Sequence, residues 1–470
     1  MQKNSFDYMI VGAGVVGANI FSALARQGLS CVMVDKALDV STGASKANSG
    51  LVHAGFDPEP NTLKAKLNVL GNKMYESEAK RLGLKITKTG AFVVGDDIKM
   101  IRKLEERAKA NGVNDVFVLN KEELHSKLPM IRENIKYGLF AKNAYIVSPY
   151  MFTICLTEEG IVNGGKVCLG FEPKRIRKVG DYYSVSNGET ELFAKTIINA
   201  AGGGYNQVAK LIGSEIYNHE FRRGEYYVLD STEKDLVPST IFPLPTAAGK
   251  GVLITPTIDG NILVGPNSEV TDTSTKTTAT GINFVKEKAK DIVPSINLKK
   301  TIRIFAGVRS IVGSDFVIEK SKIKENVINI AGICSPGLSA APAIALYVLD
   351  MLGISTKIKP AEKIEPYLNF NSLSRSKQNE IIAKNPAYGR IVCKCEGISE
   401  GEIIAALSRP LKVYSVDGIK RRTRTGMGRC QGGFCLSKTI ELIAKKNKIS
   451  VFDVVKENKG SNIIVSEVKK

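Results

Sequence analysis

The chain of 470 residues is 43% hydrophobic and 24% charged, with a formal net charge of +19. This length exceeds what one hydrophobic core usually needs, so two or three globular domains are expected. The N-terminal segment lacks the basic and apolar regions of a secretion signal, and the longest apolar stretch is too short and too interrupted to span a bilayer. We therefore expect a cytoplasmic protein, and peripheral contact with the inner face of the membrane stays open.

The positive charge is concentrated near the C-terminus. Residues 385–470 contain 17 Lys or Arg and 8 Asp or Glu, a net charge of +9 in under a fifth of the chain. Basic proteins bind nucleic acids, anionic lipids or acidic substrates, although net charge by itself reports on solubility and association rather than fold. The sequence has no aromatic interleaving and no known nucleic-acid motif, so we expect no nucleic-acid binding. The uneven charge predicts a separate C-terminal module.

The chain begins with the pattern of a strand–turn–helix–strand unit. Residues 6–11 and 30–34 predict buried strands, and apolar periodicity between them predicts a helix that ends near Gln27. The turn before the helix has the spacing G-x-G-x-x-G, whose glycines permit the sharp bend, the approach of a pyrophosphate and close helix–strand packing. An acidic residue at the end of the second strand is placed to accept hydrogen bonds from the ribose hydroxyls of a dinucleotide. The motif does not distinguish FAD from NAD. The predicted dinucleotide-binding residues are Gly12, Gly14, Val15, Val16, Gly17, Asp35 and Lys36.

The segments that follow predict helices, a second group of strands and a return to the first domain. Apolar positions three and four apart predict helices over 64–82 and 97–111, whereas residues 86–95 and 220–270 predict strands of an antiparallel substrate domain. Apolar strands at 195–201 and 327–332 and a buried helix at 340–352 predict a return to the first domain. The expected fold class is α/β, a doubly wound nucleotide-binding domain with an inserted, mainly antiparallel substrate domain and a small helical domain at the C-terminus.

These predictions divide the chain into three parts. The first is a large domain at 1–368, with a nucleotide part at about 1–80, 145–215 and 325–365 and a substrate part at about 81–144 and 216–324. A polar segment without a strong apolar pattern, 369–386, is the expected linker, and 387–470 is the expected C-terminal domain.

Four of the eight cysteines cluster in the C-terminal part. Cys393 and Cys395 form a C-x-C pair, and Cys430 and Cys435 follow after 34 residues as a pair with four residues between them. Four thiolates brought to one place suit an iron–sulfur cluster or zinc. The short C-x-C pair differs from the usual zinc knuckle, so the spacing favours iron–sulfur.

Three further stretches resemble a known family. Residues 41–68, the hexapeptide FAGVRS at 305–310 and residues 328–345 are similar to FAD-dependent oxidoreductases of the D-amino-acid oxidase type. The nearest members are glycerol-3-phosphate oxidases and dehydrogenases and L-2-hydroxyglutarate dehydrogenases. The resemblance implies FAD, bound covalently or not. The further cofactor-binding residues that it implies are Ser45, Asn48, Ser49, Gly202, Gly332, Ile333, Gly337, Leu338 and Ser339.

The same resemblance implies a catalytic and a substrate-binding set. His53 lies inside the flavin motif, and an imidazole near neutral pKa suits removal of a hydroxyl proton while hydride moves to the flavin. Arg309 would bind the anionic end of the substrate, with Lys250 as a second cation and Ser335 as a hydrogen-bond donor. Arg222, Arg223 and Tyr226 form a polar cluster on a predicted strand, and any of them is a candidate to line the cavity.

The cysteine segment resembles the [2Fe–2S] domain of bacterioferritin-associated ferredoxin. Residues 422–435 are similar to the version of this domain that is fused to anaerobic glycerol-3-phosphate dehydrogenase subunits. That ferredoxin has two residues inside its second cysteine pair, whereas this chain has four. Basic residues flank the pair, and we expect them to offset the charge of the cluster or to dock an acidic redox partner. These residues are Lys420, Arg421, Arg422, Arg424 and Arg429.

Together the resemblances imply an FAD-dependent dehydrogenase that oxidises sn-glycerol 3-phosphate to dihydroxyacetone phosphate. Electrons would leave singly through the cluster to a redox protein or a quinone-linked acceptor. Two alternatives stay open at this point. One is an L-2-hydroxyglutarate dehydrogenase, because a carboxylate also satisfies Arg309. The other is a non-catalytic electron-transfer subunit that holds FAD and the cluster.

Overall fold

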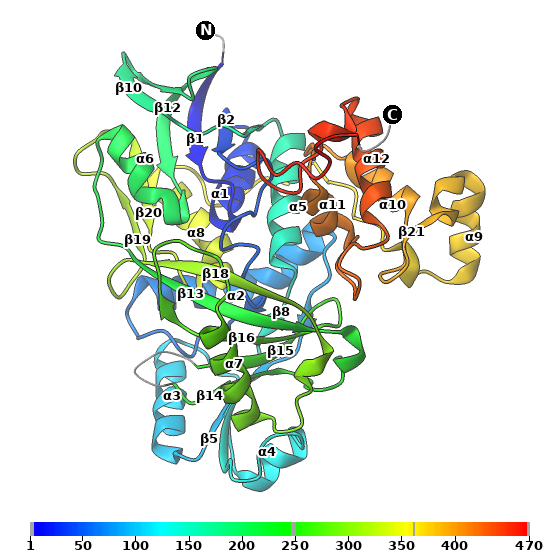
Figure 1. The fold of residues 1–470 in the computed structure, drawn as a ribbon. Coiled ribbons are helices and arrows are strands. Elements are labelled where there is room, and N and C mark those ends of the chain that lie inside the picture. The colour runs from blue at the N-terminus through cyan, green and yellow to red at the C-terminus, as the bar shows by residue number, and fades with distance from the viewer. Residues whose placement is uncertain (1–3, 246–250, 361, 468–470) are drawn as a thin grey trace.

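The computed structural model describes residues 4–245, 251–360 and 362–467. A first sheet, at the top of Figure 1, has a parallel centre in the order β9-β2-β1-β12-β20. The sheet continues beyond β12 with the hairpin β10–β11, and β19 pairs with β20. These three strand pairs, β11–β12, β10–β11 and β19–β20, are antiparallel. The strands are β1 (Ser5–Val11), β2 (Cys31–Asp35), β9 (Lys166–Leu169), β10 (Arg175–Val179), β11 (Tyr182–Ser186), β12 (Glu191–Asn199), β19 (Val317–Lys320) and β20 (Val327–Ala331).

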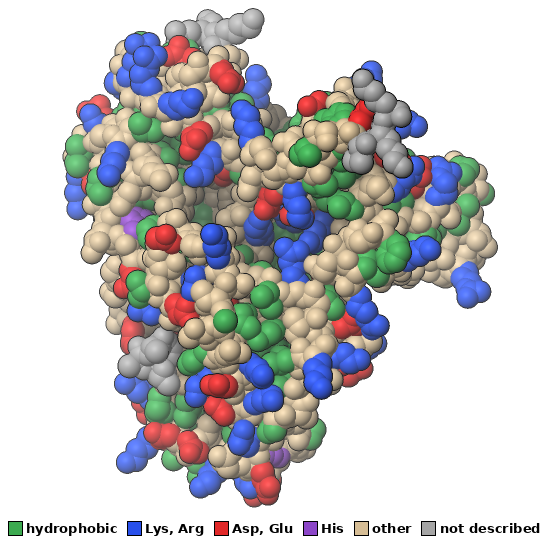
Figure 2. All heavy atoms as spheres, viewed as in Figure 1, with side chains coloured by type: hydrophobic (Ala, Val, Ile, Leu, Met, Phe, Trp, Pro, Cys, Tyr) green, Lys and Arg blue, Asp and Glu red, His purple; other side chains and the backbone are tan. Residues whose placement is uncertain are grey.

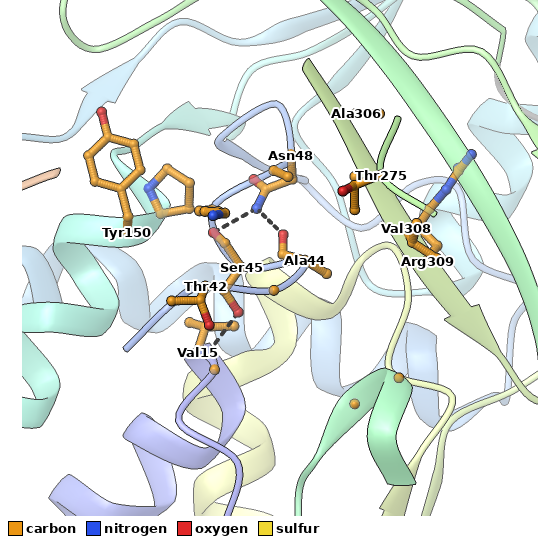
Figure 3. Close-up of a pocket in the computed structure, with 18 of the residues that line it drawn as sticks. Val15, Thr42, Ala44, Ser45, Asn48, Tyr150, Thr275, Ala306, Val308 and Arg309 are labelled. Carbon is orange, nitrogen blue, oxygen red and sulfur yellow. Dashed lines mark hydrogen bonds between the residues drawn. The ribbon is translucent and has the colours of Figure 1, made fainter. Parts of the chain in front are cut away.

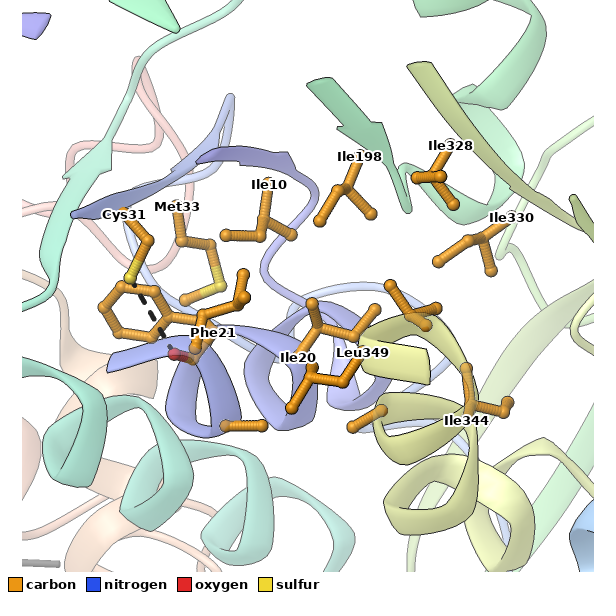
Figure 4. Packing of buried hydrophobic residues seen from close by; sticks show 14 of the residues in the cluster. Ile10, Ile20, Phe21, Cys31, Met33, Ile198, Ile328, Ile330, Ile344 and Leu349 are labelled. Atoms are coloured by element: carbon orange, nitrogen blue, oxygen red, sulfur yellow. Dashed lines mark hydrogen bonds between the residues drawn. The ribbon is translucent and has the colours of Figure 1, made fainter. Parts of the chain in front are cut away.

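Helices cover this first sheet and bury its central strands. They are α1 (Val15–Arg26), α5 (Pro149–Val162), α6 (Tyr205–Ile212) and α8 (Gly337–Met351), and α2 (Leu63–Leu82) packs on α8. Parallel strands buried on both faces consist of nearly continuous apolar runs, and every residue of β20 is buried. Figure 4 shows Ile10, Ile198 and Ile328 of the sheet packed over Ile20 of α1 and Ile344 of α8. The predicted strand–helix–strand start of the chain is therefore confirmed.

A second, mainly antiparallel sheet lies below the first. Its order is β17-β13-β16-β15-β14-β5-β7-β6, with β18 paired to β13; among these pairs β14–β5 is parallel. The strands are β5 (Ala91–Gly95), β6 (Val116–Leu119), β7 (Tyr137–Ala141), β13 (Glu220–Leu229), β14 (Thr240–Pro243), β15 (Leu253–Pro256), β16 (Ile262–Gly265), β17 (Glu269–Val270) and β18 (Thr301–Ile311). Helices α3 (Ile98–Ala110), α4 (Lys121–Lys127) and α7 (Ala279–Ile292) belong to this part.

Short strands form a third, small sheet. They are β3 (Leu51–Val52), β4 (Thr87–Lys88) and β8 (Tyr145–Ile146), which pair in the order β3-β8-β4. The predicted α/β class with an antiparallel insertion is confirmed, while the boundary residues of the domains stay predictions.

The C-terminal part is a small helical unit beside the first sheet, coloured orange to red in Figure 1. It contains β21 (Ile391–Cys393), β22 (Ile398–Ser399), α10 (Glu400–Leu407), α11 (Val416–Thr423) and α12 (Leu436–Asn447). These elements share a core of their own that includes Ile403, Ile419 and Ile443. No helix in the described ranges has the length and hydrophobicity that a membrane crossing requires.

The segment 369–386, expected as a linker, contains the helix α9 (Arg375–Lys384). Ser374 caps this helix by accepting a hydrogen bond from the backbone N–H of Lys377. None of its residues is buried, and Figure 1 shows it at the outer edge of the molecule. A helix that buries no face has no apolar stripe, which is why hydrophobic periodicity does not predict it.

Candidate functional site

A cavity of about 2300 Å³ lies where the two sheets and the C-terminal unit meet. Its walls include the glycine-rich turn, the loop 42–53, strands β13 and β18, the loop 333–338 and residues of the C-terminal unit. Figure 2 shows the surface hollowed there, with Lys and Arg side chains gathered around the hollow. Sites for drug-sized ligands are about 300–1,000 Å³, so this cavity has room for an extended ligand together with a small substrate.

The glycine-rich turn is held by the end of β2. The N–H of Gly12 donates to the carbonyl of Val34 (2.8 Å), and the N–H of Ala13 donates to the Asp35 carboxylate (2.7 Å). Gly12 has a φ of +113°, and a Cβ there would lie 2.4 Å from the carbonyl oxygen of Ala200. A Cβ on Gly17 would lie 1.9 Å from the carbonyl oxygen of Gly12. The predicted roles of these two glycines therefore match their surroundings, and Gly17 packs the helix without lining the cavity.

Asp35 lines the cavity but also organises the turn. Its second oxygen accepts the N–H of Ala37 (2.8 Å). Burial raises the pKa of this carboxyl, and the two N–H donors oppose the shift. Lys36 lies beside it in the cavity wall.

The N-terminus of α1 faces the cavity. Gly14 is its N-cap and its first turn has no acidic side chain. Ser45 Oγ accepts the N–H of Val15 (2.9 Å), as Figure 3 shows, and Val15, Val16 and Ser45 all line the cavity. Helix N-termini present unpaired N–H groups and a positive partial charge to anions, so this end of the cavity fits the pyrophosphate of a dinucleotide.

Asn48 differs from the other predicted cofactor residues because its side chain holds its own loop. Its Nδ2 donates to the carbonyls of Ala44 and Ser45 (both 3.0 Å), and its Oδ1 accepts the N–H of Gly50 (2.8 Å). Asn48 and the neighbouring Ser49 line the cavity. Asn48 thus shapes the loop that faces the ligand.

The second predicted cofactor-binding segment, residues 332–339, contains residues that face the cavity and residues that support the wall from behind. Ile333, Ser335, Gly337 and Leu338 line the cavity, as does Gly202 from the first sheet. The other two predicted residues are absent from the cavity wall. Gly332 has a φ of +66° and no room for a Cβ beside Val312, and the buried Ser339 accepts a hydrogen bond from the loop at His53.

His53 lines the cavity directly after β3. Its backbone N–H donates to Ser339 Oγ (2.7 Å), and its carbonyl accepts from Asn72 Nδ2 (3.1 Å). Its ring lies 5.9 Å from the ring of Phe242, centroid to centroid. The backbone is therefore held on both sides, with the imidazole at the cavity wall.

Arg309 lies on β18 at the side of the cavity opposite Ser45 and Asn48 (Figure 3). Its Nη2 donates to the carbonyl of Asn267 (3.2 Å). Lys250, the predicted second cation, lies outside the described residues. The structure thus brings Arg309, Ser335 and His53 to the wall of one cavity.

The predicted polar cluster on β13 divides between its two faces. Arg222 and Tyr226 line the cavity, whereas Arg223 is absent from its wall and pairs with Glu269 (2.6 Å). Tyr226 stacks on Phe305 with ring centroids 4.8 Å apart, and burial raises its pKa to about 12, so its hydroxyl stays protonated at neutral pH. Side chains alternate across a strand, so the neighbouring Arg222 and Arg223 project to opposite faces.

The four C-terminal thiols form two close pairs. Cys395 Sγ and Cys430 Sγ lie 3.6 Å apart, and burial and then the neighbouring Cys393 raise the pKa of the Cys435 thiol to about 12, which marks Cys393 and Cys435 as the second pair. Each pair thus takes one cysteine from each sequence motif. The spacing inside the second motif therefore does not decide whether both its thiols reach one metal.

These pairs fit a two-iron cluster, in which each iron takes two protein ligands. Among the described residues, no group of three or more His, Cys, Asp or Glu side chains is arranged for a single metal ion. Burial would raise the pKa of Cys430, but backbone N–H groups, that of Phe434 first, lower it and so favour the thiolate. A Cβ on Gly428 would lie 2.3 Å from Cys395 Cβ, so glycine lets the two cysteine segments approach.

The basic residues near the cysteines have partners inside the molecule, which corrects the expectation that they surround the cluster or dock a partner. Arg421 and Arg422 are buried and bind Asp39 of the first domain (2.8 Å each). Arg424 binds Asp259 (2.8 Å) and Arg429 binds Asp230 (2.6 Å), both in the substrate part. Lys420 faces the cavity, where burial and then the charge of Arg303 lower its pKa to about 8. The four arginines thus fasten the C-terminal unit to the rest of the chain.

The C-terminal unit also supplies cavity residues that the sequence analysis did not predict. Met427 and Gln431, in the segment that contains Cys430, line the cavity. The hydroxyl of Tyr150, at the start of α5, contacts the sulfur of Met427 (3.9 Å), and burial raises the pKa of Tyr150 to about 12. No sequence signal marks Tyr150 or Met427, because their meeting depends on how the domains pack.

Comparison with known proteins follows the same division of the chain. Residues 7–351 match the family described as FAD dependent oxidoreductase, and residues 391–445 match the BFD-like [2Fe-2S] binding domain. A glycerol 3-phosphate dehydrogenase of Caloramator mitchellensis is 39% identical over 99% of this chain and 99% of its own length.

Two more relatives match a smaller share of the chain. The FAD-bound structure of L-alpha-glycerophosphate oxidase from Mycoplasma pneumoniae superposes with a TM-score of 0.72 at 31% identity, covering 77% of this chain and 96% of its own. A mitochondrial L-2-hydroxyglutarate dehydrogenase of Bos taurus is 29% identical over 56% of this chain and 61% of its own length.

Proposed function

Because this chain belongs to the FAD-dependent oxidoreductase family and has a BFD-like [2Fe–2S] binding domain, we propose that it oxidises sn-glycerol 3-phosphate to dihydroxyacetone phosphate and passes the electrons on through the cluster. The observation behind this proposal is the composition of one cavity wall. It joins the dinucleotide turn, a histidine, an arginine for an anion and the segment that contains a cluster cysteine.

FAD, when bound, supplies the acceptor for the hydride on C2 of the substrate, and the cluster supplies a one-electron carrier. The chain's own residues bind, orient and deprotonate the substrate. The Arg309 guanidinium binds the phosphate, and an imidazole nitrogen of His53 takes the proton from the C2 hydroxyl. The products are a ketone, a proton that His53 takes from the hydroxyl and returns to solvent, and a hydride, equivalent to two electrons and one proton, that FAD would accept.

We propose a dehydrogenase rather than an oxidase because an oxidase transfers electrons to oxygen without a one-electron exit. The acceptor is a redox protein or a quinone-linked carrier that meets the exposed side of the C-terminal unit. Cys395 is exposed there, and Phe434, one residue before Cys435, is 79% exposed. These two residues indicate the edge of the cluster at which electrons leave.

The test is anaerobic mixing of the purified holoenzyme with substrates, followed by the flavin absorbance near its visible maximum. We expect sn-glycerol 3-phosphate to bleach the flavin and L-2-hydroxyglutarate to leave it oxidised. Bleaching by 2-hydroxyglutarate alone would contradict the substrate assignment. Bleaching by neither compound, with dithionite still effective, would indicate a non-catalytic electron-transfer subunit.

A further inference from the structure

Strands β13 and β18 place two arginines side by side. In the antiparallel register Arg222 pairs directly with Arg309, and the next pairs that face the same way are Gly224 with Gly307 and Tyr226 with Phe305. Opposed residues of an antiparallel pair project to the same face of the sheet. All six residues line the cavity, so both guanidinium groups belong to one wall.

The two guanidinium groups also reach the same short segment. Arg309 Nη2 donates to the carbonyl of Asn267 (3.2 Å), and Arg222 Nη1 donates to the hydroxyl of the next residue, Ser268 (3.3 Å). A guanidinium has five N–H donors, so each group keeps donors for a ligand. The side chain of Arg222 is 31% exposed, and its remaining donors are accessible from the cavity.

The two guanidinium groups of Arg222 and Arg309 have fewer carboxylate partners than positive charges. Glu220 binds Arg222 through Nε, and no described carboxylate lies within ion-pair distance of Arg309. Like charges directly opposite on a sheet are destabilising, and here one carboxylate faces two guanidinium groups. A ligand with two negative charges would restore the balance.

We propose that Arg222 is a second substrate-binding arginine, which forms with Arg309 a clamp for a dianionic phosphoryl group. The inference rests on the proposed function and adds a residue that selects the substrate. A phosphate monoester carries close to two charges and three acceptor oxygens at neutral pH, whereas a carboxylate carries one charge and two oxygens. Paired guanidinium forks therefore favour the phosphate ester over a 2-hydroxy acid.

Arg222→Met in the holoenzyme tests the clamp by anaerobic flavin reduction. We expect the glycerol 3-phosphate concentration for half-maximal rate to rise about 10- to 100-fold, because charge-assisted hydrogen bonds to the phosphate are lost. The maximal rate should change little, because the phosphate takes no part in the bond changes and is bound equally in ground and transition states. Inorganic phosphate should also become a weaker competitive inhibitor by a similar factor.

Three comparisons separate binding from a structural effect. The half-saturating concentration of Arg222→Lys should lie between those of the wild type and Arg222→Met, because lysine retains the positive charge but lacks the two-pronged donor geometry of a guanidinium group. Arg177→Met removes an arginine on β10 that pairs with Glu191 (3.6 Å) and is absent from the cavity wall, and should leave half-saturation within about twofold. Slow reduction by glycerol, which lacks phosphate, should be the same in wild type and Arg222→Met.

Two failures have different meanings. Wild-type half-saturation and phosphate inhibition in both Arg222 variants would overturn the clamp while leaving the proposed function in place. Failure of glycerol 3-phosphate to reduce the wild-type flavin would overturn the proposed function itself. If Arg222→Met does not retain FAD, the Arg222→Lys variant decides the question.

Discussion

At the scale of single residues, the position of His53 is its most informative property. Its backbone is fixed by Ser339 Oγ on one side and Asn72 Nδ2 on the other, and these two contacts hold the residue at the cavity wall. A general base must be held within reach of the proton that it removes. Such support from α8 and α2 suits a catalytic role better than a packing role.

We predict that His53→Ala lowers the maximal rate of flavin reduction by glycerol 3-phosphate about 10²–10⁴-fold, the usual contribution of general-base catalysis. FAD content and half-saturation should change little, because the backbone contacts that hold the loop remain. Stopped-flow absorbance under anaerobic conditions measures both quantities. His125→Ala, on α4 and hydrogen-bonded to the carbonyl of Ile135 (2.9 Å), is the matched control and should reduce at the wild-type rate. Full reduction rate in His53→Ala would show that another group is the base.

At the scale of elements, helix α11 forms a buried link between the C-terminal unit and the first domain. Its Arg422 binds both oxygens of Asp39 (2.8 and 2.9 Å), and its Arg421 binds Asp39 and Glu457. The Asp39 carboxylate and the Arg422 side chain are fully buried. Removing one partner of a buried ion pair usually costs about 3–5 kcal/mol, because it leaves an uncompensated charge.

We predict that Asp39→Asn loosens the docking of the C-terminal unit and lowers the thermal midpoint of unfolding. Glycerol 3-phosphate should still bleach the flavin, while reduction of a one-electron acceptor slows, because the cluster no longer stays against the cavity. Glu441→Gln, which removes an exposed pair with Lys438 (3.2 Å), is the control and should leave both readouts unchanged. Unaltered acceptor reduction in Asp39→Asn would show that docking does not limit electron transfer.

The same residue gives the docking a pH dependence. Burial alone would raise the pKa of Asp39, but Arg422 and Arg421 outweigh it and lower the pKa to about 2. An unperturbed aspartate has a pKa of about 3.9, so the stabilisation is complete above about pH 4 and is lost as pH falls from there to about 2. Limited proteolysis across this range should show release of the C-terminal unit in the wild type, with a weaker dependence in Asp39→Asn.

At the scale of the whole molecule, the arrangement of the cofactor sites suggests the path of the electrons. The segment with Cys430 forms part of the wall of the cavity, and Met427 in that segment contacts Tyr150. The Cys395–Cys430 pair is the more exposed one, whereas Cys393 and Cys435 are buried. The more exposed cysteine pair therefore includes Cys430, whose own segment also borders the cavity.

We predict that Cys430→Ser lowers the iron and acid-labile sulfide content and abolishes reduction of a one-electron acceptor. Bleaching of the flavin by glycerol 3-phosphate should remain, because the substrate and dinucleotide sites do not depend on this thiol. Cys168→Ser, which changes a cysteine on β9 remote from the cluster motif, is the control and should retain both iron and electron transfer. Wild-type acceptor reduction in Cys430→Ser would mean that electrons leave from the flavin directly.

Much of the local structure follows from the sequence alone. The strand–turn–helix–strand start, the helices at 63–82 and 98–110 and the buried helix α8 agree with their predicted positions within a few residues. Hydrogen bonds along a helix and the period of its apolar face are local, so a short window contains the signal. Helix α9 is missed because it has no buried face, and that signal is absent.

The partners of the charged residues were decided by tertiary structure. Arg421 and Arg422 belong to the basic segment beside the cysteines, yet they bind Asp39, 382 and 383 residues away in the chain. Arg222 and Arg309 meet because β13 and β18 pair in one register, and a shift by one residue would turn one of them to the other face. Residue type and spacing indicated a dinucleotide site and a thiolate-bound metal centre, because a phosphate-binding turn and a thiolate set are local chemistry, and the family resemblance implied FAD. Which charged residues become neighbours near the cofactor sites depended on packing between distant segments. A buried charge needs a partner, and that partner comes within reach only after the domains have docked.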